Sequence, residues 1–360
     1  MKTITPPLDG PVCPLPLTHH DQIVLGHGSG GKMTHDLIAK VFRPPLSNPA
    51  LDAGDDAAVV QVCNVAPNQA PLRLAVSTDS HVVWPLFFAG GDIGRLAVCG
   101  TVNDLAMMGA KPLYLTAGFV IEEGLDIAVL QQVVTSMQAA AQEARVQIVA
   151  GDTKVVQKGK ADKLFINTSG IGSINTDIHI NGSNAQPGDI VIVSGTLGDH
   201  GIAVLEARGE LGFETNIQSD VAPLNHLVEA ILSVSHQIHV LRDPTRGGLA
   251  TSLNEIAAQS QVGILLEENQ IPVHPTTAAA CEMLGFDPLY VANEGKLIAI
   301  VGPDDAQVVL DAMRATLYGA GAAIIGEVGS HHPGRVLLKT AIGGTRIVDV
   351  LAGEMLPRIC

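Results

Sequence analysis

The sequence is poor in aromatic residues, in positive charge and in long apolar runs. Aromatics make up 3% of the 360 residues, which disfavours an aromatic-rich binding surface, while 46% hydrophobic residues allow a large α/β core. Lysine and arginine number 21 against 36 acidic residues, a formal charge of −15. Nucleic acid and anionic membranes are therefore disfavoured as partners. No segment reaches the roughly 18 uninterrupted apolar residues of a membrane span.

Cysteines are few and carry no metal-binding spacing. The five are Cys13, Cys63, Cys99, Cys281 and Cys360. An odd number without a CxxC pair predicts neither a disulfide framework nor a structural zinc site, and favours a reducing, cytoplasmic location. Residues 1–20 hold five prolines and lack the apolar stretch of a signal peptide. We expect a proline-stiffened arm there.

The length favours two domains. Apolar spacing predicts a helix over residues 93–108, strands over 72–77, 113–121, 147–149 and 163–172, and a long helix around 130–144. A turn at Pro187-Gly188-Asp189 precedes a strand at 190–194, so the domain boundary is placed near residue 185. Alternating strands and helices continue to about 340. We expect an arm at 1–20, an N-terminal domain at 21–185, a C-terminal α/β domain at 186–340 and a mobile tail at 341–360.

A glycine-rich run, Gly26-His27-Gly28-Ser29-Gly30-Gly31-Lys32, favours phosphate binding. Glycines let backbone N–H groups approach an anion, and the lysine adds a positive charge. The run is not a dinucleotide fingerprint, because the proline-rich segment after it cannot form the next strand. It is not a P-loop either, because Met33 stands where a magnesium-binding hydroxyl belongs. A plain flexible loop remains the alternative.

Isolated acidic residues stand after glycines, at strand ends or in an almost uncharged helix: Asp55, Asp56, Asp79, Asp104, Asp152 and Asp243. Burying a carboxylate there is costly unless it is paired or metal-bound. Mg²⁺ prefers oxygen ligands and shares them with phosphates. A helix cap or a turn explains any one of these residues equally well, but together they favour a magnesium–nucleotide site.

Two later segments add charged groups. Arg246 and Gly247 open a predicted helix whose N-terminus suits an anion. Glu294 lies in Asn293-Glu294-Gly295-Lys296, just before an apolar strand. A hairpin turn explains this second segment as well as a functional role does.

The end of the sequence, Pro357-Arg358-Ile359-Cys360, places a thiol on a predicted mobile segment. Pro357 keeps the chain extended, and Arg358 is expected to favour the thiolate. A tail of ~20 residues at ~3.3 Å each reaches at most ~66 Å. This suits a carrier that visits two active sites, although an incidental cysteine remains possible.

These motifs, together with Ser77-Thr78-Asp79-Ser80, Gly90-Gly91-Asp92 and Gly151-Asp152-Thr153-Lys154, resemble those of the HypE family of hydrogenase maturation factors. The resemblance runs from about residue 24 to 360, and its most specific part is the final Pro-Arg-Ile-Cys. It extends to the wider superfamily of aminoimidazole ribonucleotide synthetase and selenophosphate synthetase. It implies an α/β protein with an N-terminal mixed-sheet domain that pairs in a homodimer, a C-terminal α/β domain, and ATP held across them.

The resemblance also implies an activity: ATP-dependent dehydration of a carbamoyl group on Cys360 to a thiocyanate, for the cyano ligands of [NiFe]-hydrogenase. The carbamoyl transferase HypF would load the thiol, and the HypC–HypD complex would receive the cyano group. The implied catalytic residues are Cys360, Glu294 and Lys154. The implied Mg²⁺ ligands are Asp56, Asp79, Asp104 and Asp243. The implied ATP-binding residues are Gly28, Gly30, Gly31, Lys32, Asp55, Asp79, Asn103, Asp152, Thr153, Arg246 and Gly247.

Glu294 is the better base of the two candidates, because a lysine must be desolvated to lose its proton near pH 7. The sequence departs from the family at Ala89, where a proline is expected, and the arm lies outside the resemblance. Two other functions remain open: another ATP-dependent enzyme of the superfamily, acting on a ribonucleotide amide or on selenide, or a non-enzymatic nucleotide-binding scaffold. The glycine-rich run holds no cysteine, which argues against a selenophosphate synthetase.

Overall fold

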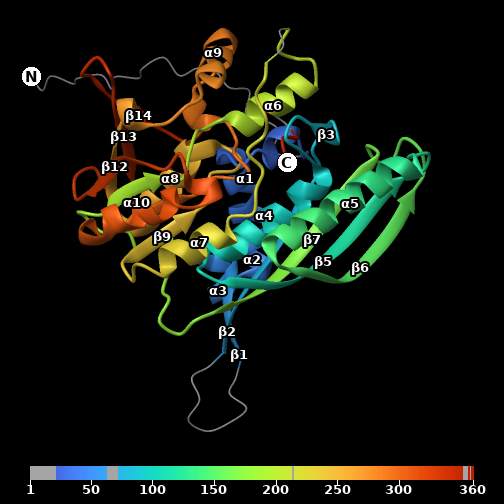
Figure 1. Ribbon diagram of the computed structural model, residues 1–360, viewed down its shortest axis with the longest axis horizontal. Helices are drawn as coiled ribbons and strands as arrows, with labels where there is room; N and C mark the ends of the chain where they lie inside the picture. The colour runs from blue at the N-terminus through green and yellow to red at the C-terminus, as the bar shows by residue number, and fades with distance from the viewer. Residues whose placement is uncertain (1–21, 63–71, 213–214, 352–355, 357) are drawn as a thin grey trace, which may run out of the picture.

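The computed structural model describes residues 22–62, 72–212, 215–351, 356 and 358–360. The expected arm at 1–20 lies outside these residues. The chain forms two α/β domains side by side, each built on one main sheet (Figure 1). Within the described ranges, no helix has the length and apolar character needed to cross a membrane.

The N-terminal domain contains a five-stranded mixed sheet in the order β1-β2-β7-β5-β6. Only β5 and β6 are parallel. Its strands are β1 (Ala58–Val62), β2 (Leu72–His81), β5 (Lys111–Glu122), β6 (Gln147–Val156) and β7 (Leu164–Ile174). Along β7 buried residues alternate with more exposed ones, the pattern of a strand covered on one face. The sequence predicted four of these strands, and β1 was missed.

Helices α4 (Ile93–Met107) and α5 (Ile127–Ala144) cover one face of this sheet (Figure 1). Asp92 caps α4, because its carboxylate accepts hydrogen bonds from Gly94 N and Arg95 N. Nearly every residue of α4 is buried. The helix lies between the sheet and the C-terminal domain, so a polar side chain on it has an interior position.

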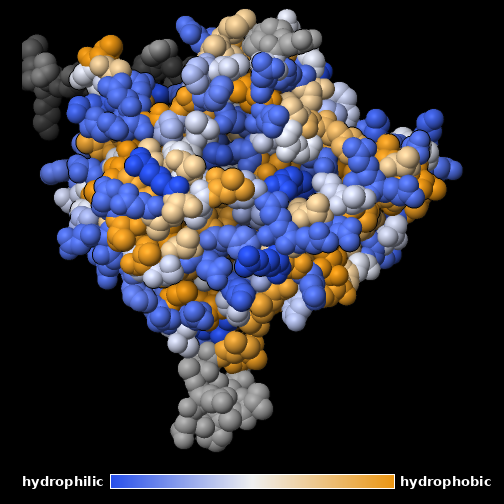
Figure 2. All heavy atoms as spheres, viewed as in Figure 1, coloured by the Kyte–Doolittle hydropathy of each residue, from blue (hydrophilic) through white to orange (hydrophobic). Residues whose placement is uncertain are grey.

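The opposite face of the sheet is exposed and apolar. In Figure 2 apolar residues come to the surface along the lower right of the molecule, where Figure 1 places this sheet. The exposed large apolar residues on this face are Val60, Val62, Leu72, Val76, Tyr114, Val120 and Ile171. An exposed apolar face of this size on a single chain is typical of a surface that binds another protein.

The C-terminal domain contains a seven-stranded mixed sheet in the order β14-β13-β10-β12-β8-β11-β9. Helix α8 packs on one face of it, and α7 and α10 pack on the other. The strands are β8 (Ile190–Val193), β9 (Ile238–Arg242), β10 (Gly263–Glu267), β11 (Ile298–Val301), β12 (Ala323–Gly329), β13 (Arg335–Lys339) and β14 (Thr345–Val348). The helices are α6 (Asp199–Ala207), α7 (Asn225–Leu232), α8 (Gly248–Ser260), α9 (Pro275–Leu284) and α10 (Ala306–Arg314).

Short elements complete the chain. Helices α1 (Lys32–Leu37), α2 (Arg43–Leu46) and α3 (Pro49–Asp52) follow the glycine-rich run, and β3 (Phe87–Phe88) pairs with β4 (Gly91–Asp92).

The expectation of a mobile tail from residue 341 is wrong for β14, which pairs with β13 and extends the C-terminal domain. Four residues, of which only Val348 is fully buried, give too weak a pattern to predict a strand. Residues 358–360 lie against the body of the protein, near β3 and α6 (Figure 1). Residues 352–355 and 357 of the expected tail lie outside the described part.

Candidate active site

Carboxylates from both domains converge where the domains meet. Asp79 lies on β2, Asp104 on α4, Asp56 before β1 and Asp243 directly after β9. Burial, followed by repulsion from neighbouring carboxylates, raises the pKa of Asp104 well above its usual value. The same two causes, opposed by Arg242, raise the pKa of Asp56. The predicted grouping of these four side chains is therefore present in the fold.

Arg242, at the end of β9, partly neutralises this cluster. Its guanidinium lies 3.1 Å from Asp56 Oδ1 and 3.2 Å from Glu255 Oε2. Asp56 Oδ2 is buried without a hydrogen-bond partner among the described residues. Asp55 differs, because its carboxylate accepts hydrogen bonds from the Asn181 side chain at 2.7 Å and Gly182 N at 2.9 Å. Asp55 therefore ties down the turn at the domain boundary.

The cluster fits a divalent cation in charge and donor type. Carboxylate oxygens are ligands that Mg²⁺ prefers, and one oxygen of Asp56 lacks a partner. A cation would also relieve the repulsion that raises the pKa values of Asp56, Asp104 and Asp243. In the described part of the chain, no three His, Cys, Asp or Glu side chains are placed to hold a metal ion by themselves. Phosphate oxygens would have to complete the coordination.

Asp243 gives a testable consequence for stability. Burial is the main cause that raises its pKa from 3.8 to about 6. The folded protein therefore binds more protons than the unfolded chain between these values, and the free energy of unfolding falls as the pH rises through this window. We expect Asp243→Asn to stabilise the nucleotide-free protein at pH 8 by at most about 3 kcal/mol, with a smaller gain at pH 5.

Thermal unfolding at the two pH values measures this effect. Asp311→Asn, an exposed change on α10, is the matched control and should leave the Tm unchanged. If the Tm of Asp243→Asn at pH 8 is equal to or below that of the wild type, the buried charge of Asp243 does not destabilise the folded protein.

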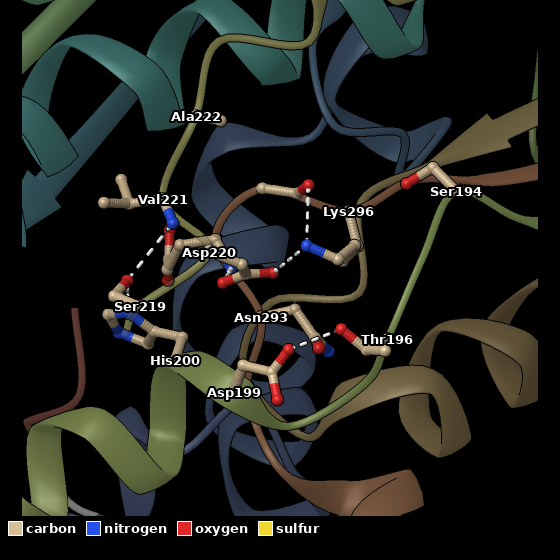
Figure 3. A network of polar contacts seen from close by, with 12 residues as sticks. Ser194, Thr196, Asp199, His200, Ser219, Asp220, Val221, Ala222, Asn293 and Lys296 are labelled. Carbon is tan, nitrogen blue, oxygen red and sulfur yellow. Dashed lines mark hydrogen bonds and ion pairs between the residues drawn. The ribbon is translucent and has the colours of Figure 1, made fainter. Parts of the chain in front are cut away.

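Glu294 lies beside the cluster in the loop before β11. It is 5% exposed, and its Oε1 has no hydrogen-bond partner among the described residues. Burial raises its pKa well above the usual value, the carboxylates Asp79 and Asp243 raise it further, and Arg246 opposes them. Its backbone N–H donates to Asp220 Oδ1, and Asp220 also forms an ion pair with Lys296 Nζ at 3.0 Å (Figure 3). The loop is thus fixed while the carboxylate of Glu294 stays available.

Cys360 is docked into the same region. It is 8% exposed, and Cys360 O accepts a hydrogen bond from Val82 N at 2.9 Å. Burial raises the pKa of its thiol to about 12, Arg246 opposes this, and Glu294 adds to it. Arg358 was expected to favour the thiolate, but its guanidinium binds Asp162 and Val82 O instead. The cation that acts on the thiol is Arg246.

The glycine-rich run packs against Arg246. The Arg246 guanidinium donates to Gly28 O at 3.0 Å, and a Cβ at Gly30, whose φ is +76°, would lie only 3.1 Å from Arg246 Cβ. Lys32 N donates to Leu351 O at 3.1 Å, while the Lys32 side chain is exposed. Gly247, with φ of +79°, precedes α8, and a Cβ there would collide with Thr251. The fold therefore brings the glycine-rich run and the N-terminus of α8, the two predicted anion sites, together around Arg246.

Asn103 was predicted to bind the nucleotide, but its amide already binds three backbone groups. Nδ2 donates to Ala222 O at 3.1 Å and to Glu294 O at 3.4 Å, and Oδ1 accepts from Leu224 N at 2.8 Å. The buried side chain joins α4 to the C-terminal domain. Asn103 thus positions the Glu294 loop, and its amide is occupied in doing so.

Asp152, Thr153 and Lys154 lie on β6 and are not brought to the cluster within one chain. Three strand spacings separate β2 from β6, or about 14 Å. Lys154 is opposite the exposed Val120, so Asp152 and Lys154 project from the exposed face of the sheet. They pair with each other at 2.7 Å.

Three residues outside the predicted site shape it, and of these the sequence drew attention only to His200, as a structural histidine. Arg242 neutralises Asp56, Asp220 holds the Glu294 loop through Lys296, and His200 contacts the docked end of the chain. The side chains of all three are buried and can carry a charge, a costly combination unless they are paired.

Comparison with known proteins identifies the family. The model "AIR synthase related protein, N-terminal domain" matches residues 54–174, and "AIR synthase related protein, C-terminal domain" matches residues 186–339. The carbamoyl dehydratase HypE of Cupriavidus necator is 52% identical over 339 residues, covering 94% of this chain and 95% of that protein. The chain belongs to the HypE family.

Solved HypE structures share this fold. One in a HypE–HypF complex is 50% identical and covers 88% of this chain and 99% of that one, with a TM-score of 0.82. A second, of HypE in complex with ATP, is 49% identical and covers 94% and 100%, with a TM-score of 0.77. The predicted fold of two α/β domains agrees with these matches.

Proposed function

We propose that this protein is an ATP-dependent carbamoyl dehydratase that converts a carbamoyl group on the Cys360 thiol into a thiocyanate. One observation carries the proposal: Cys360 is docked in a buried position under the electrostatic influence of both Arg246 and Glu294. A cargo on the sulfur would then lie next to a base, a cation and a cluster of carboxylates. The dehydratase name of the relatives supports the same activity.

The chemistry needs a better leaving group than an amide oxygen. The carbamoyl oxygen attacks the γ-phosphorus of ATP, ADP leaves, and one N–H proton is lost as an O-phosphoryl imidate forms. The second N–H proton then leaves, the C–O bond breaks and phosphate departs, which gives S–C≡N, ADP and phosphate. Glu294 is placed to accept these protons, since it is buried beside the docked thiol and burial raises its pKa well above that of an ordinary carboxylate, which makes it a stronger base once ionised.

ATP is proposed to lie between the domains, with its phosphates near Arg246 and the glycine-rich run. The ATP complex of the HypE relative supports nucleotide binding by this fold. Asp56, Asp79, Asp104 and Asp243 would hold Mg²⁺, which neutralises charge on the phosphates during phosphoryl transfer. Holding the carbamoyl group and the nucleotide in one site, in the geometry needed for attack, supplies much of the rate enhancement in such reactions.

Loading is proposed to occur elsewhere. A thiol with a pKa of about 12 carries almost no thiolate near neutral pH, and the thiolate is the nucleophile. Residues 358–360 would therefore leave the site to receive the carbamoyl group from HypF, and return for dehydration. The HypE–HypF complex of the relative supports this partner. We place these steps in the cytoplasm, with the HypC–HypD complex as acceptor of the cyano group.

The exposed apolar face of the N-terminal sheet is proposed to pair with that of a second copy, forming a homodimer. Ile171→Glu would place a charge in the middle of this face, and we expect it to turn the dimer into monomers in sedimentation equilibrium. Ile342→Glu, which alters an isoleucine that is 96% exposed in the other domain, should remain dimeric. A dimeric Ile171→Glu variant would contradict the pairing. Lys154, on the same exposed face, is proposed to act across this interface.

The activity itself is tested by ATP turnover. Protein with HypF and a carbamoyl donor should form ADP and phosphate in proportion to the cyano groups produced. Nucleotide binding without product formation would instead support the scaffold function.

A further inference from the structure

Residues 358–360 are docked through every one of their backbone carbonyl groups. Arg358 O accepts from Trp84 N at 3.4 Å and from the Arg208 guanidinium, and Cys360 O accepts from Val82 N at 2.9 Å. Ile359 O, between them, accepts from His200 Nε2 at 2.8 Å. An unpaired buried carbonyl is costly, so releasing residues 358–360 requires all of these hydrogen bonds to be broken together.

His200 is itself held in one orientation. Its Nδ1 accepts from the hydroxyl of Ser219, whose oxygen in turn accepts from Val221 N at 3.1 Å (Figure 3). The ring packs edge-on against Phe88, with centroids 5.4 Å apart. Burial lowers the pKa of His200, so the ring is neutral. The proton is therefore on Nε2, which faces Ile359 O.

Two charged contacts flank this histidine. Arg208 bridges two segments of the chain, the one around Trp84 and residues 358–360. Its Nε donates to Trp84 O at 2.7 Å, and the other end of the guanidinium donates to Arg358 O. Asp162 accepts from the Arg358 guanidinium, which lies 6.0 Å from the centre of the Phe165 ring. Hydrogen bonds that involve a charged group are the stronger kind.

We infer that His200, Arg208 and Asp162 form a docking clamp for residues 358–360 that positions the Cys360 cargo for dehydration and has no part in loading. The inference rests on the proposed function. His200 and Arg208 contact backbone carbonyl groups of residues 358–360, and Asp162 contacts the Arg358 guanidinium, so each acts through the backbone or through Arg358. They are positioning residues. A docked thiol is buried, so loading must use the released segment, in which these contacts are broken.

The two steps can be measured separately. In a Glu294→Gln background dehydration is blocked, and the gain of carbamoyl mass after addition of HypF, carbamoyl phosphate and ATP reports loading alone. With Glu294 present, the same intact-mass time course reports dehydration, since a slow second step lets the carbamoyl form accumulate before the cyano form.

We expect Arg208→Ala to load within twofold of the rate seen with Arg208 intact, and to dehydrate at least tenfold more slowly, with the carbamoyl form accumulating. His200→Ala should behave in the same way, and Arg208→Lys should recover part of the rate. Arg335→Ala, at an exposed arginine on β13, is the matched control and should follow the wild type in both steps. Unchanged Tm values confirm that the variants are folded.

Dehydration by Arg208→Ala within twofold of the wild type would overturn the inference. Equal slowing of loading and dehydration would overturn it as well, because the arginine would then serve HypF binding or general stability. Absence of any carbamoyl or cyano mass on the wild-type protein is a separate failure, since it would contradict the proposed function and not the clamp.

Discussion

Replacing Cys360 with alanine is expected to abolish both products: neither a carbamoyl nor a cyano mass appears, and ATP turnover with HypF and carbamoyl donor falls to background. The reason is that the sulfur is the attachment point of the cargo, so no other group in the site can substitute for it. Intact mass spectrometry and phosphate release measure the two effects on the same sample.

Cys281→Ala is the matched control for this experiment. Cys281 is also buried and has a pKa raised to about 11, but it lies on α9, in a different apolar cluster from Cys360. It should keep both mass changes. A Cys360→Ala protein that still gains a stable carbamoyl or cyano mass would show that the carrier is another residue.

Glu294→Gln has the second largest expected effect. Loading should continue while dehydration falls by about 10² to 10⁴, the range found when a general base is removed. The carbamoyl form would then persist in the mass spectrum. Glutamine has nearly the same size and cannot accept the N–H protons, so folding and docking should be kept. Glu282→Gln, an exposed change on α9, is the control.

The pH dependence gives an independent check on Glu294. A base must be ionised to act, and burial raises the pKa of this carboxylate well above 4.5. The rate of dehydration in the wild type should therefore rise with pH through a midpoint above 4.5, and this rise should be absent from the residual rate of Glu294→Gln. A rise that persists in the variant would assign the titration to another group.

Much of the fold was predictable because apolar periodicity is strong in long elements. The buried helix α4 and the alternating strand β7 were predicted within a few residues. Strands β1, β9 and β14 were missed because each has only four or five residues and includes polar or charged side chains, whereas the equally short β8, which was predicted, is wholly apolar.

The candidate site was predictable to the extent that chemistry depends on residue type. Four of the isolated carboxylates, Asp56, Asp79, Asp104 and Asp243, lie close enough together that burial and mutual repulsion raise the pKa values of Asp56 and Asp104, whereas Asp152 lies apart from them on β6. The roles of Asn103 and Arg358 could not be foreseen, because they depend on which backbone groups lie opposite in the folded chain. The separation of Lys154 from Glu294 depends on strand order, which the local sequence does not encode.

The central claim is that Cys360 carries a carbamoyl group that loses water in this site. Its most direct test is the intact mass of the wild-type protein over time with HypF, carbamoyl phosphate and ATP. The account predicts a gain of one carbamoyl group, followed by loss of the mass of one water as ADP forms. A carbamoyl mass that stays constant while ATP is consumed would contradict it.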